Sequence, residues 1–409
     1  MLRRLVLAIA FLSLAACATT PPPSVDRPPP APLPVILVSI DGFRPDYLDR
    51  GVTPHLSRLA AEGVRGVIRP AFPSKTFPNH YTLVTGLRPD RHGIVENTFE
   101  DPEIPGETFR MSNRKAVGDR KWWDQGAPIW VTAERAGVVT APVYWPGSEA
   151  EIRGVRPTHW RAFQMSRPND ARVDDLLALL DLPPARRPRF LTLYFDTVDT
   201  AGHRFGPAAP ETVAAVAEID TQVGRLAAGL KARGLAANLV VVSDHGMAPL
   251  AEDRRIFMDD ILPRSAWRTL AAGAFMTIYP AEGRTAEVEA ALLKPHTHMA
   301  CWRKAEIPAR FRYGRNPRVA PIFCLPETGW SLTTRDYRPS WSERGNHGFD
   351  PESPEMAAVF VAGGPAFRRG VVLPAFDNVS VYPLLARLLG VTPEPNEGDI
   401  RDVAAALTR

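Results

Sequence analysis

Three aspartates follow short apolar runs of the kind that form buried strands. Asp41 ends "VILVSID", Asp199 closes "LTLYFDTVD", and Asp244 ends "LVVVSD". A single aspartate after a strand is an ordinary cap or turn residue. Three carboxylates gathered at neighbouring strand ends would repel one another unless a cation lay between them. The pattern therefore predicts a cation site.

Histidines accompany these aspartates. His203 lies four residues after Asp199, His245 directly follows Asp244, and His347 lies between small residues in "GNHGF". A lone histidine is more often structural, but three beside three carboxylates form a mixed oxygen and nitrogen set that suits Zn²⁺. A catalytic zinc usually takes about three protein ligands. Six candidates therefore predict two zinc ions.

The segments around these residues alternate between strand and helix patterns. Residues 35–40 form an unbroken apolar run that predicts a buried parallel strand, and "TPHLSRLAAEG" predicts a helix capped by its threonine. The same alternation recurs to the end of the chain, which predicts an α/β fold with a central, mostly parallel sheet flanked by helices. Ligands bind at the carboxyl ends of the strands in such sheets, where the three aspartates would lie. Residues 250–340 fit the alternation poorly and predict an inserted smaller subdomain.

Composition and the N-terminus set the cellular context. The 409 residues carry a net charge of +4 and no basic run, which argues against nucleic-acid binding. Residues 1–16 are typical of a signal peptide and end in a lipobox-like "LAAC", which predicts lipidation of Cys17. Residues 17–34 form a Pro-rich tether. We expect an exported, periplasmic lipoprotein of a bacterial cell envelope, with residues 35–405 as the catalytic domain; a chance cysteine after an ordinary signal is the alternative.

Two further cysteines, Cys301 and Cys324, remain in the exported part. An oxidising compartment allows them to form a disulfide, and exported free thiols are a liability. Two independent buried thiols are the alternative.

Six motifs make the sequence resemble a known family. They are "DGFRPDYL", "TPHLSRLAAEG", "FPSKTFPNHYTLVTGLRPDRHGI", "YFDTVDTAGHRFGP", "VVSDHGM" and "GNHGF". In this order they are similar to the nucleotide pyrophosphatase/phosphodiesterase family of the alkaline phosphatase superfamily. The resemblance covers nearly the whole chain after the tether and implies an alkaline-phosphatase-like fold.

The resemblance also implies roles for individual residues. It implies that one zinc is held by Asp199, His203 and His347, and the other by Asp41, Asp244, His245 and the nucleophile Thr76. It implies that Asn97, in "GIVENTF", donates a hydrogen bond to a phosphate oxygen. The spacing of the D-x-x-x-H motif points to Asp199 as the ligand and leaves Asp196 a structural or supporting role.

Chemistry and resemblance agree on the mechanism. A threonine hydroxyl is not ionised near neutral pH, but zinc lowers the pKa of bound water from 15.7 to about 7. Thr76 is therefore expected to attack phosphorus and to form a covalent phosphothreonine intermediate. Two zinc ions, three aspartates and an ionised Thr76 sum to zero charge, which favours a singly charged phosphodiester. No arginine flanks Thr76, and the direction of the Lys75 side chain is open.

Two aromatic residues are candidates for gripping a nucleobase. Phe77 directly follows the nucleophile, and Trp160 is the closest match to an aromatic residue, usually tyrosine, that the family carries after "WPG". Two aromatic faces can sandwich a base, although plain packing is the alternative for each.

The leading hypothesis is an exported zinc-dependent phosphodiesterase or pyrophosphatase that acts on nucleotides. A phosphodiesterase for lipid or choline head groups, in which the aromatic residues cage a cation, is one alternative. A phosphate monoesterase is another, and a catalytically inactive binding lipoprotein would be expected to have lost ligands. A sulfatase is disfavoured because "CLPET" around Cys324 lacks the arginine of that family's motif. Gly-rich nucleotide-binding loops of the GxxxxGK[ST] or GxGxxG type are absent from the sequence.

Overall fold

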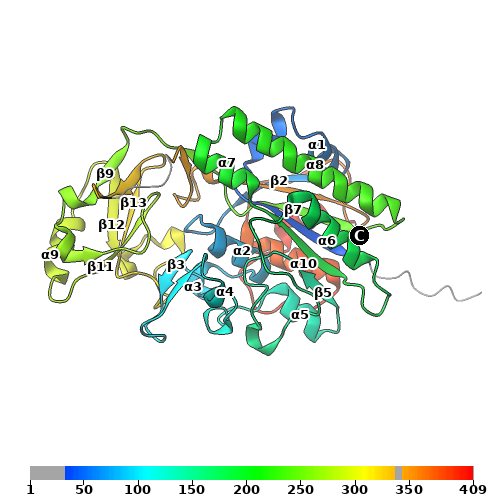
Figure 1. Cartoon of the computed structure of the whole chain (residues 1–409), viewed down its shortest axis with the longest axis horizontal. Helices are drawn as coiled ribbons and strands as arrows, with labels where there is room; N and C mark the ends of the chain where they lie inside the picture. Colours follow the sequence, from blue (N-terminus) through cyan, green and yellow to red (C-terminus); the bar gives the residue numbers. More distant parts are fainter. Residues whose placement is uncertain (1–32, 337–342, 409) are drawn as a thin grey trace, which may run out of the picture. The chain divides into compact units, whose positions relative to one another are not determined.

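A computed structural model describes residues 33–336 and 343–408 of the chain. Residues 33 onward form one compact unit (Figure 1). The signal peptide, Cys17 and nearly all of the tether lie outside the described residues. Within the described ranges, the longest helices fall short of the length and apolarity that crossing a bilayer needs.

The central sheet runs in the order β17-β2-β16-β7-β1-β6-β5, with β18 also paired to β2. Strands β7, β1, β6 and β5 are mutually parallel, as the sequence predicts, whereas β16 runs antiparallel to both of its neighbours. Every residue of β1, β6, β7 and β16 is buried, because helices cover both faces. The strands are β1 (Val35–Ile40), β2 (Val64–Arg69), β5 (Thr140–Pro142), β6 (Phe190–Phe195), β7 (Asn238–Val242), β16 (Ala358–Gly363), β17 (Val371–Val372) and β18 (Phe376–Asp377).

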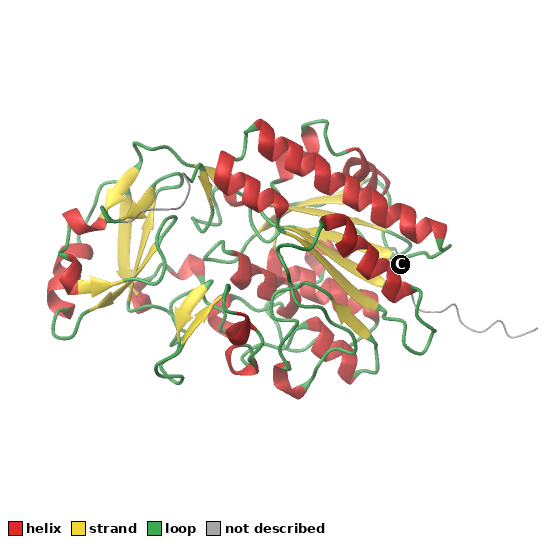
Figure 2. Cartoon of the chain, viewed as in Figure 1, coloured by secondary structure: helices red, strands yellow, loops and turns green. Residues whose placement is uncertain are grey.

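Two sets of helices cover the sheet (Figures 1 and 2). One face packs against α1 (Pro54–Glu62), α6 (Asn169–Leu180), α7 (Thr197–Phe205) and α8 (Pro210–Ala232). The opposite face packs against α2 (Thr76–Thr85), α5 (Ile129–Arg135) and α10 (Val381–Leu389). Each set buries an apolar cluster against the strands, so the sheet lies between two cores.

Helix α1 is capped differently from the sequence prediction. Thr53 occupies the N-cap position, but its side chain makes no capping hydrogen bond. The carboxylate of Asp220, from α8, instead accepts hydrogen bonds from the backbone N–H groups of His55 at 3.1 Å and Leu56 at 2.7 Å. A negative charge at a helix N-terminus satisfies these donors and the helix dipole together. Because Asp220 lies far from α1 in the sequence, the residues around α1 did not reveal this cap.

The region from residue 250 carries a second sheet with its own core. The antiparallel order is β10-β11-β13-β12, and α9 packs against it through Val288 and Leu292. The elements are β10 (Trp267–Arg268), β11 (Met276–Pro280), α9 (Thr285–Leu292), β12 (Met299–Arg303) and β13 (Ile322–Pro326).

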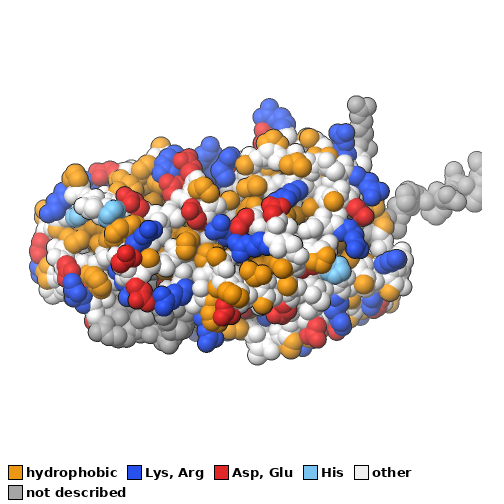
Figure 3. Space-filling model, turned by 90° about the horizontal axis from the view of Figure 1, so that it is seen from above, with side chains coloured by type: hydrophobic (Ala, Val, Ile, Leu, Met, Phe, Trp, Pro, Cys, Tyr) orange, Lys and Arg blue, Asp and Glu red, His pale blue; other side chains and the backbone are white. Residues whose placement is uncertain are grey.

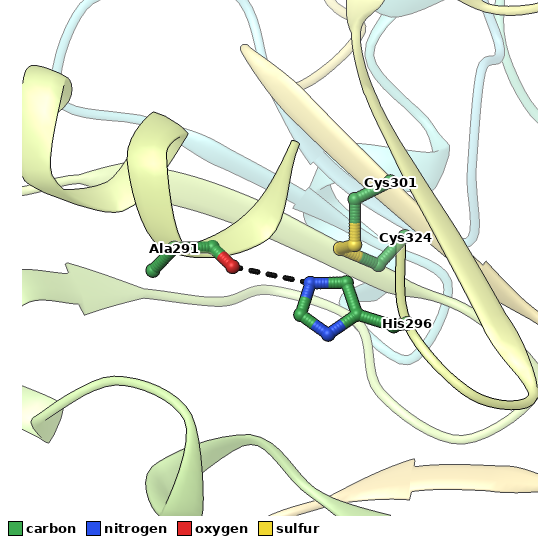
Figure 4. Close-up of a disulfide and its surroundings, with 4 residues drawn as sticks. All are labelled: Ala291, His296, Cys301 and Cys324. Carbon is green, nitrogen blue, oxygen red and sulfur yellow. Dashed lines mark hydrogen bonds between the residues drawn. A yellow bond between two sulfur atoms is a disulfide. The ribbon is translucent and has the colours of Figure 1, made fainter. Parts of the chain in front are cut away.

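Cys301 and Cys324 form a disulfide that joins β12 to β13. The two residues lie directly opposite each other across the strand pair, with a Cα–Cα distance of 4.1 Å. Beside the bridge, the His296 ring donates from Nε2 to the carbonyl of Ala291 at 3.1 Å (Figure 4). The bridge ties edge strand β12 to the interior of the second sheet.

Shorter elements connect these layers. They are α3 (Pro89–His92), β3 (Thr98–Glu100), β4 (Thr108–Arg110), α4 (Arg114–Val117), β8 (Ala248–Pro249), β9 (Arg255–Phe257), β14 (Ser331–Thr333), β15 (Gly345–Asn346) and α11 (Arg401–Ala404). Acidic and basic side chains are interspersed over the face drawn in Figure 3, as the nearly balanced count of 49 basic and 45 acidic residues would give.

Candidate active site

Thr76 is the first residue of α2, and its side chain is almost fully buried. The preceding loop is held by Asn79, whose amide donates to the carbonyls of Pro73 at 3.0 Å and Lys75 at 2.9 Å. The Asn79 Oδ1 in turn accepts from the backbone N–H of Ala71 at 2.7 Å. The hydroxyl therefore lies at the positive end of a ten-residue helix, where a developing negative charge is stabilised. This role of Asn79 was not predicted from the sequence.

The fold brings all six predicted ligands to one end of the sheet. Asp41 directly follows β1, and Asp244 and His245 follow β7. Asp199 and His203 are one turn apart on α7, and His347 follows β15. The parallel strand ends, the helix that follows β6 and the segment after β15 thus supply residues that are up to about three hundred positions apart in sequence.

The first group, which we call the inner cluster, is Asp41, Asp244 and His245. The Nε2 of His245 lies 2.9 Å from Asp244 Oδ2 and 3.4 Å from Asp41 Oδ1. It is also 3.3 Å from the Thr76 hydroxyl. Nδ1 of the same ring lies 2.9 Å from the carbonyl of Gly246, so in a neutral ring Nδ1 donates to that carbonyl and leaves Nε2 as the possible ligand atom. The predicted nucleophile is therefore in direct contact with this cluster.

The second group, the outer cluster, is Asp199, His203 and His347. Asp199 Oδ1 lies 3.5 Å from Nε2 of both histidines. The two Nε2 atoms are 3.1 Å apart. The Nδ1 atoms are taken by backbone carbonyls, that of Gly345 for His203 at 2.9 Å and that of Ser74 for His347 at 2.8 Å. Two neutral rings held in this way would point bare lone pairs at each other, so the arrangement calls for a cation.

The donor atoms of both clusters fit metal ions. Asp41 Oδ1, Asp199 Oδ1 and Asp244 Oδ2 are buried and have no hydrogen-bond partner among the described residues. Buried carboxylate oxygens are costly in that state unless a cation is present. The nitrogen donors are fixed in the tautomer that metal ligation requires, because each Nδ1 donates to a carbonyl.

Ligand atoms of the inner cluster lie close to ligand atoms of the outer cluster. Those of Asp199, His245 and His347 lie within 4.8 Å of one another, and so do those of Asp41, His80 and Asp244. The His245 and His347 rings stack 3.5 Å apart, so the inner and outer clusters share a border. The geometry brings the six ligands together, and how they divide between two ions stays a prediction.

His80 lies beside the inner cluster but has both ring nitrogens engaged. Its Nδ1 lies 2.8 Å from the carbonyl of Thr76, and its Nε2 lies 2.9 Å from the Ser39 hydroxyl. Nδ1 is also 3.4 Å from Asp244 Oδ2. These contacts suit a residue that supports the nucleophile helix better than a metal ligand.

The pKa values of the inner carboxyl groups depend on their burial and on the charges close to them. Burial raises the pKa of Asp41 well above its ordinary value, and the nearby carboxylates of Asp244 and Asp199 raise it further. Burial also favours the neutral form of Asp244, but the charges of His245 and His80 hold its pKa well below the ordinary value. Two neighbouring carboxyl groups whose pKa values are shifted in opposite directions are typical of a functional site.

The two outer histidines respond in opposite directions. Burial and the charge of His245 lower the pKa of His347 well below its usual range. Burial also opposes the charged form of His203, but Asp199 and Glu343 outweigh it and raise its pKa.

Tyr194 is a supporting residue that was not predicted from the sequence. Its hydroxyl donates to Asp41 Oδ2 at 2.6 Å, which leaves Oδ1 as the free oxygen of that carboxylate. Asp244 is held similarly, because its Oδ1 accepts from the Ser243 hydroxyl at 3.3 Å and from the backbone N–H of Gly42 at 3.4 Å. The available signal was a tyrosine next to the last residue of a buried strand.

Asn97 and Phe77 lie beside Thr76. Asn97 Oδ1 accepts from the backbone N–H of Phe77 at 2.9 Å, which orients the side chain and leaves its amide group available as a donor. The Phe77 ring contacts Phe109 and Trp123, with centroids 5.9 and 6.0 Å away. Phe77 is 8% exposed, so its present role includes packing.

Trp160 and Asp196 each contact an arginine side chain. The Trp160 ring is 40% exposed, carries the Arg156 guanidinium 5.2 Å from its centroid, and makes no ring contact with Phe77 in the described part of the chain. Asp196 accepts from the nearly buried Arg172 at 2.8 Å, which suits the supporting role predicted for it.

The Lys75 side chain, whose direction the sequence left open, extends towards Phe275. Its ammonium lies 5.6 Å from the centre of the Phe275 ring, and its charge opposes protonation of both His347 and His203, although less strongly than burial does. Lys75 and His203 line a cavity of about 540 Å³ that reaches towards the second sheet. A positive side chain thus lies close to the outer cluster, on a wall of an open space.

Comparison with known proteins gives consistent matches. A family model described as type I phosphodiesterase / nucleotide pyrophosphatase matches residues 35–350. An uncharacterized pyrophosphatase/phosphodiesterase of Schizosaccharomyces pombe is 39% identical over 386 residues, which cover 89% of this chain and 78% of the yeast protein. Ectonucleotide pyrophosphatase/phosphodiesterase family member 3 of Mus musculus is 36% identical over 400 residues, which cover 94% of this chain but only 45% of the mouse protein.

Solved structures agree with these matches. An inactive variant of murine ectonucleotide pyrophosphatase / phosphodiesterase 5, in complex with AMP, superposes with a TM-score of 0.88 at 33% identity. The match covers 92% of this chain and 100% of that chain. Fold, motif order and sequence identity over nearly the whole described region lead to one conclusion: the chain belongs to the type I phosphodiesterase/nucleotide pyrophosphatase family of the alkaline phosphatase superfamily.

Proposed function

We propose that this hydrolase uses two zinc ions to cleave phosphodiester or pyrophosphate bonds of nucleotides, with Thr76 as the nucleophile. One observation carries the proposal: three unpartnered carboxylate oxygens and three Nε2 atoms converge beside the hydroxyl of Thr76. Asp41, Asp244 and His245 would hold one ion with Thr76. Asp199, His203 and His347 would hold the other.

The donor set favours zinc because it mixes imidazole nitrogen with carboxylate oxygen. When bound, two zinc ions supply positive charge that lowers the pKa of a hydroxyl and offsets charge on the phosphate. The protein supplies the remaining functions. Asn79 holds the loop that carries Thr76, and the N-terminus of α2 favours the ionised form of the hydroxyl.

The covalent step is a displacement at phosphorus. The Thr76 oxygen forms a bond to phosphorus as the bond to the leaving oxygen breaks, and the threonine proton is lost before or during attack. Water then attacks the phosphothreonine, and the threonine oxygen leaves and regains a proton. The Asn97 amide is positioned to donate to a non-bridging phosphate oxygen beside Thr76.

Nucleotide specificity rests on Phe77, with Trp160 as the candidate second face of a base sandwich. A related enzyme with the same fold binds AMP. Lys75 adds a positive charge near the outer cluster, which would offset the charge of the additional phosphate in a substrate with a pyrophosphate bond.

A substrate panel tests the proposal. Purified protein of measured zinc content is assayed with nitrophenyl esters of a nucleoside monophosphate, of phosphocholine and of phosphate itself. We expect the nucleotide diester to be cleaved with the highest kcat/KM, and chelation followed by zinc addition to abolish and restore that activity. A preference for the choline ester or for the phosphate monoester would replace the proposed substrate class.

We also propose export and lipidation at Cys17, on the strength of the apolar N-terminal run and the "LAAC" motif. In a bacterial host, the wild-type chain is expected in the membrane fraction and Cys17→Ala in the soluble exported fraction. Equal distribution of both proteins would contradict lipidation.

A further inference from the structure

A small basic cavity lies behind the loop that leads to the nucleophile. Its volume is about 260 Å³, and none of its lining residues is a candidate metal ligand or a nucleotide contact of the proposed site. Four arginines and three acidic residues contribute to its wall, a net charge of +1. They are Arg69, Arg88, Arg310, Arg312, Asp350, Glu352 and Asp377.

The acidic side chains are already used by three of the arginines. Asp377 pairs with Arg69 at 2.9 Å and with Arg88 at 2.7 Å. Asp350 accepts both terminal nitrogens of Arg310, at 2.8 and 2.5 Å. The guanidinium of Arg312 has no hydrogen bond or ion pair with any described residue. Arg312, whose side chain is exposed, is therefore the lining arginine without a carboxylate partner among the described residues.

A second donor at the cavity is also unsatisfied. Arg88 is 7% exposed, and its buried Nη1 has no hydrogen-bond partner among the described residues. The nearest acidic oxygen, Glu397 Oε1, lies 3.6 Å away, which is too long for a hydrogen bond. Burial lowers the pKa of Arg88, and the positive charge of Arg312 lowers it further. A buried donor of this kind costs free energy until an acceptor reaches it.

The backbone of Arg312 is held in an unfavourable conformation. Its φ of 50° and ψ of 44° are left-handed, which is uncommon for a residue other than glycine. The preceding Phe311 ring stacks on Phe72 with centroids 4.2 Å apart, and Arg310 is fixed by Asp350. These contacts hold the turn that presents Arg312 at the cavity, and strain maintained in this way is characteristic of functional positions.

From the cavity, the unpaired guanidinium of Arg312 and the unsatisfied Nη1 of Arg88, we propose a second anion site that binds a phosphate group through these two arginines. Guanidinium groups match the geometry of phosphate oxygens, and charge-assisted bonds to phosphate are strong. The cavity is smaller than the roughly 300–1,000 Å³ typical of sites for whole small molecules, so it fits a phosphate group and not an entire buried nucleotide.

The site shares structural parts with the nucleophile loop. Residues 70–72 form part of its wall, and Asn378, another wall residue, donates to Asn79 Oδ1 at 2.8 Å. Residues 350–352 follow Phe349, whose carbonyl accepts from the Ser74 hydroxyl at 3.0 Å. A phosphate in the cavity would therefore contact both segments that flank the loop carrying Thr76.

Equilibrium dialysis with labelled inorganic phosphate tests the site on the zinc-loaded full chain. Arg312→Gln removes the unpaired charge without disturbing a described contact. Arg315→Gln is the matched control, because Arg315 is exposed on the same segment but does not line the cavity. Wild type and the control are expected to bind one more phosphate per chain than Arg312→Gln, whose second site should be at least about tenfold weaker.

The comparison does not depend on whether phosphate also binds at the zinc site, because the expected difference between variants is one phosphate in either case. Equal binding by all three proteins would overturn the proposal. Unlabelled AMP then identifies the source of the ligand: displacement of the Arg312-dependent phosphate supports a site that accepts monoester phosphates. Retention of that phosphate supports a site for the inorganic ion.

Discussion

The inner and outer clusters use similar ligands but are supported in different ways. The side chains of Asp41, Asp244 and His245 are 2% exposed or less. Those of Asp199 and His203 are 16% and 18% exposed, and only His347 is nearly buried. The inner ligands follow strands of the central sheet, whereas the outer ligands lie on α7 and on the segment around β15.

Their hydrogen-bonded supports differ accordingly. The inner carboxylates are held by Tyr194, Ser243 and a backbone N–H, all within or next to the sheet. The outer histidines rely on carbonyls of Gly345 and Ser74, and the outer cluster adjoins an open cavity. This difference teaches that Thr76 lies against the more buried half of the site, while the more accessible half adjoins the open cavity.

The largest effect should come from the residue in contact with the inner cluster. Thr76→Ala removes the nucleophile but none of the six side-chain ligands, so kcat is expected to fall by at least about 10⁴-fold. Zinc content, measured by elemental analysis, should remain nearly two per chain. Thr76→Ser keeps a hydroxyl and is the matched control, with partial activity expected. Near-normal turnover by Thr76→Ala would exclude the proposed mechanism.

Removing a ligand from each cluster tests their independence. His203→Ala should lose the outer zinc and keep the inner one, because its contacts lie in the more exposed half. Activity should fall by more than about 100-fold, since loss of a ligand costs more than loss of its hydrogen-bonded support.

His245→Ala is the counterpart in the inner cluster. It should lower zinc content further and also reduce thermal stability, because it exposes the buried carboxylates of Asp41 and Asp244 to each other. Equal zinc loss and equal thermal stability of His203→Ala and His245→Ala would contradict the proposed difference between the clusters.

The support of Asp41 gives an intermediate effect. Tyr194→Phe removes the hydroxyl that fixes Asp41 Oδ2, and inner zinc affinity is expected to fall about 10–100-fold. Tyr47→Phe is the control, because the Tyr47 hydroxyl is buried without a hydrogen-bond partner among the described residues. Competition with a zinc-binding dye measures both affinities. An unchanged affinity in Tyr194→Phe would show that this tyrosine does not support the inner zinc.

Protons should compete with zinc for the His203 ring of the outer cluster. Asp199 and Glu343 outweigh burial and raise the pKa of His203 above 6.5, so this ring stays protonated to a higher pH than an ordinary histidine. Zinc requires the neutral ring. Outer zinc affinity should therefore rise with pH up to that pKa, by up to about tenfold per pH unit, and then level off. Calorimetric titration of the wild type over a pH series measures the slope, and a flat profile would contradict the prediction. The inner zinc that His203→Ala keeps is the control, and its affinity should lack this His203-dependent slope.

Much of the fold was predictable because its strands are continuous apolar runs. The runs at residues 35–40, 190–195 and 238–242 are strands at those positions. The direction of β16 was not predictable, because a buried strand has the same apolar pattern whether it runs parallel or antiparallel. The tertiary cap on α1 escaped for a similar reason, since Asp220 is remote in sequence from the helix it caps.

In the site, the residue types that bind metals were recognisable from motif spacing, and the fold brings all six together. The supporting contacts of Tyr194 and Asn79 were not, because both residues are common in strands and loops and their partners lie elsewhere in the chain. The direction of Lys75 also required coordinates. The stacking role of Trp160 stays a prediction, as does the division of the ligands between two ions.

The stacked rings of His245 and His347 have a consequence for cooperativity. They lie 3.5 Å apart with planes 13° from parallel, and each belongs to a different cluster. The spacing between the inner and outer clusters is therefore set by the direct contact of two aromatic rings and not by a hinge. Displacing either ring is expected to disturb the other, so loss of a ligand from one cluster should also alter the geometry of the other cluster.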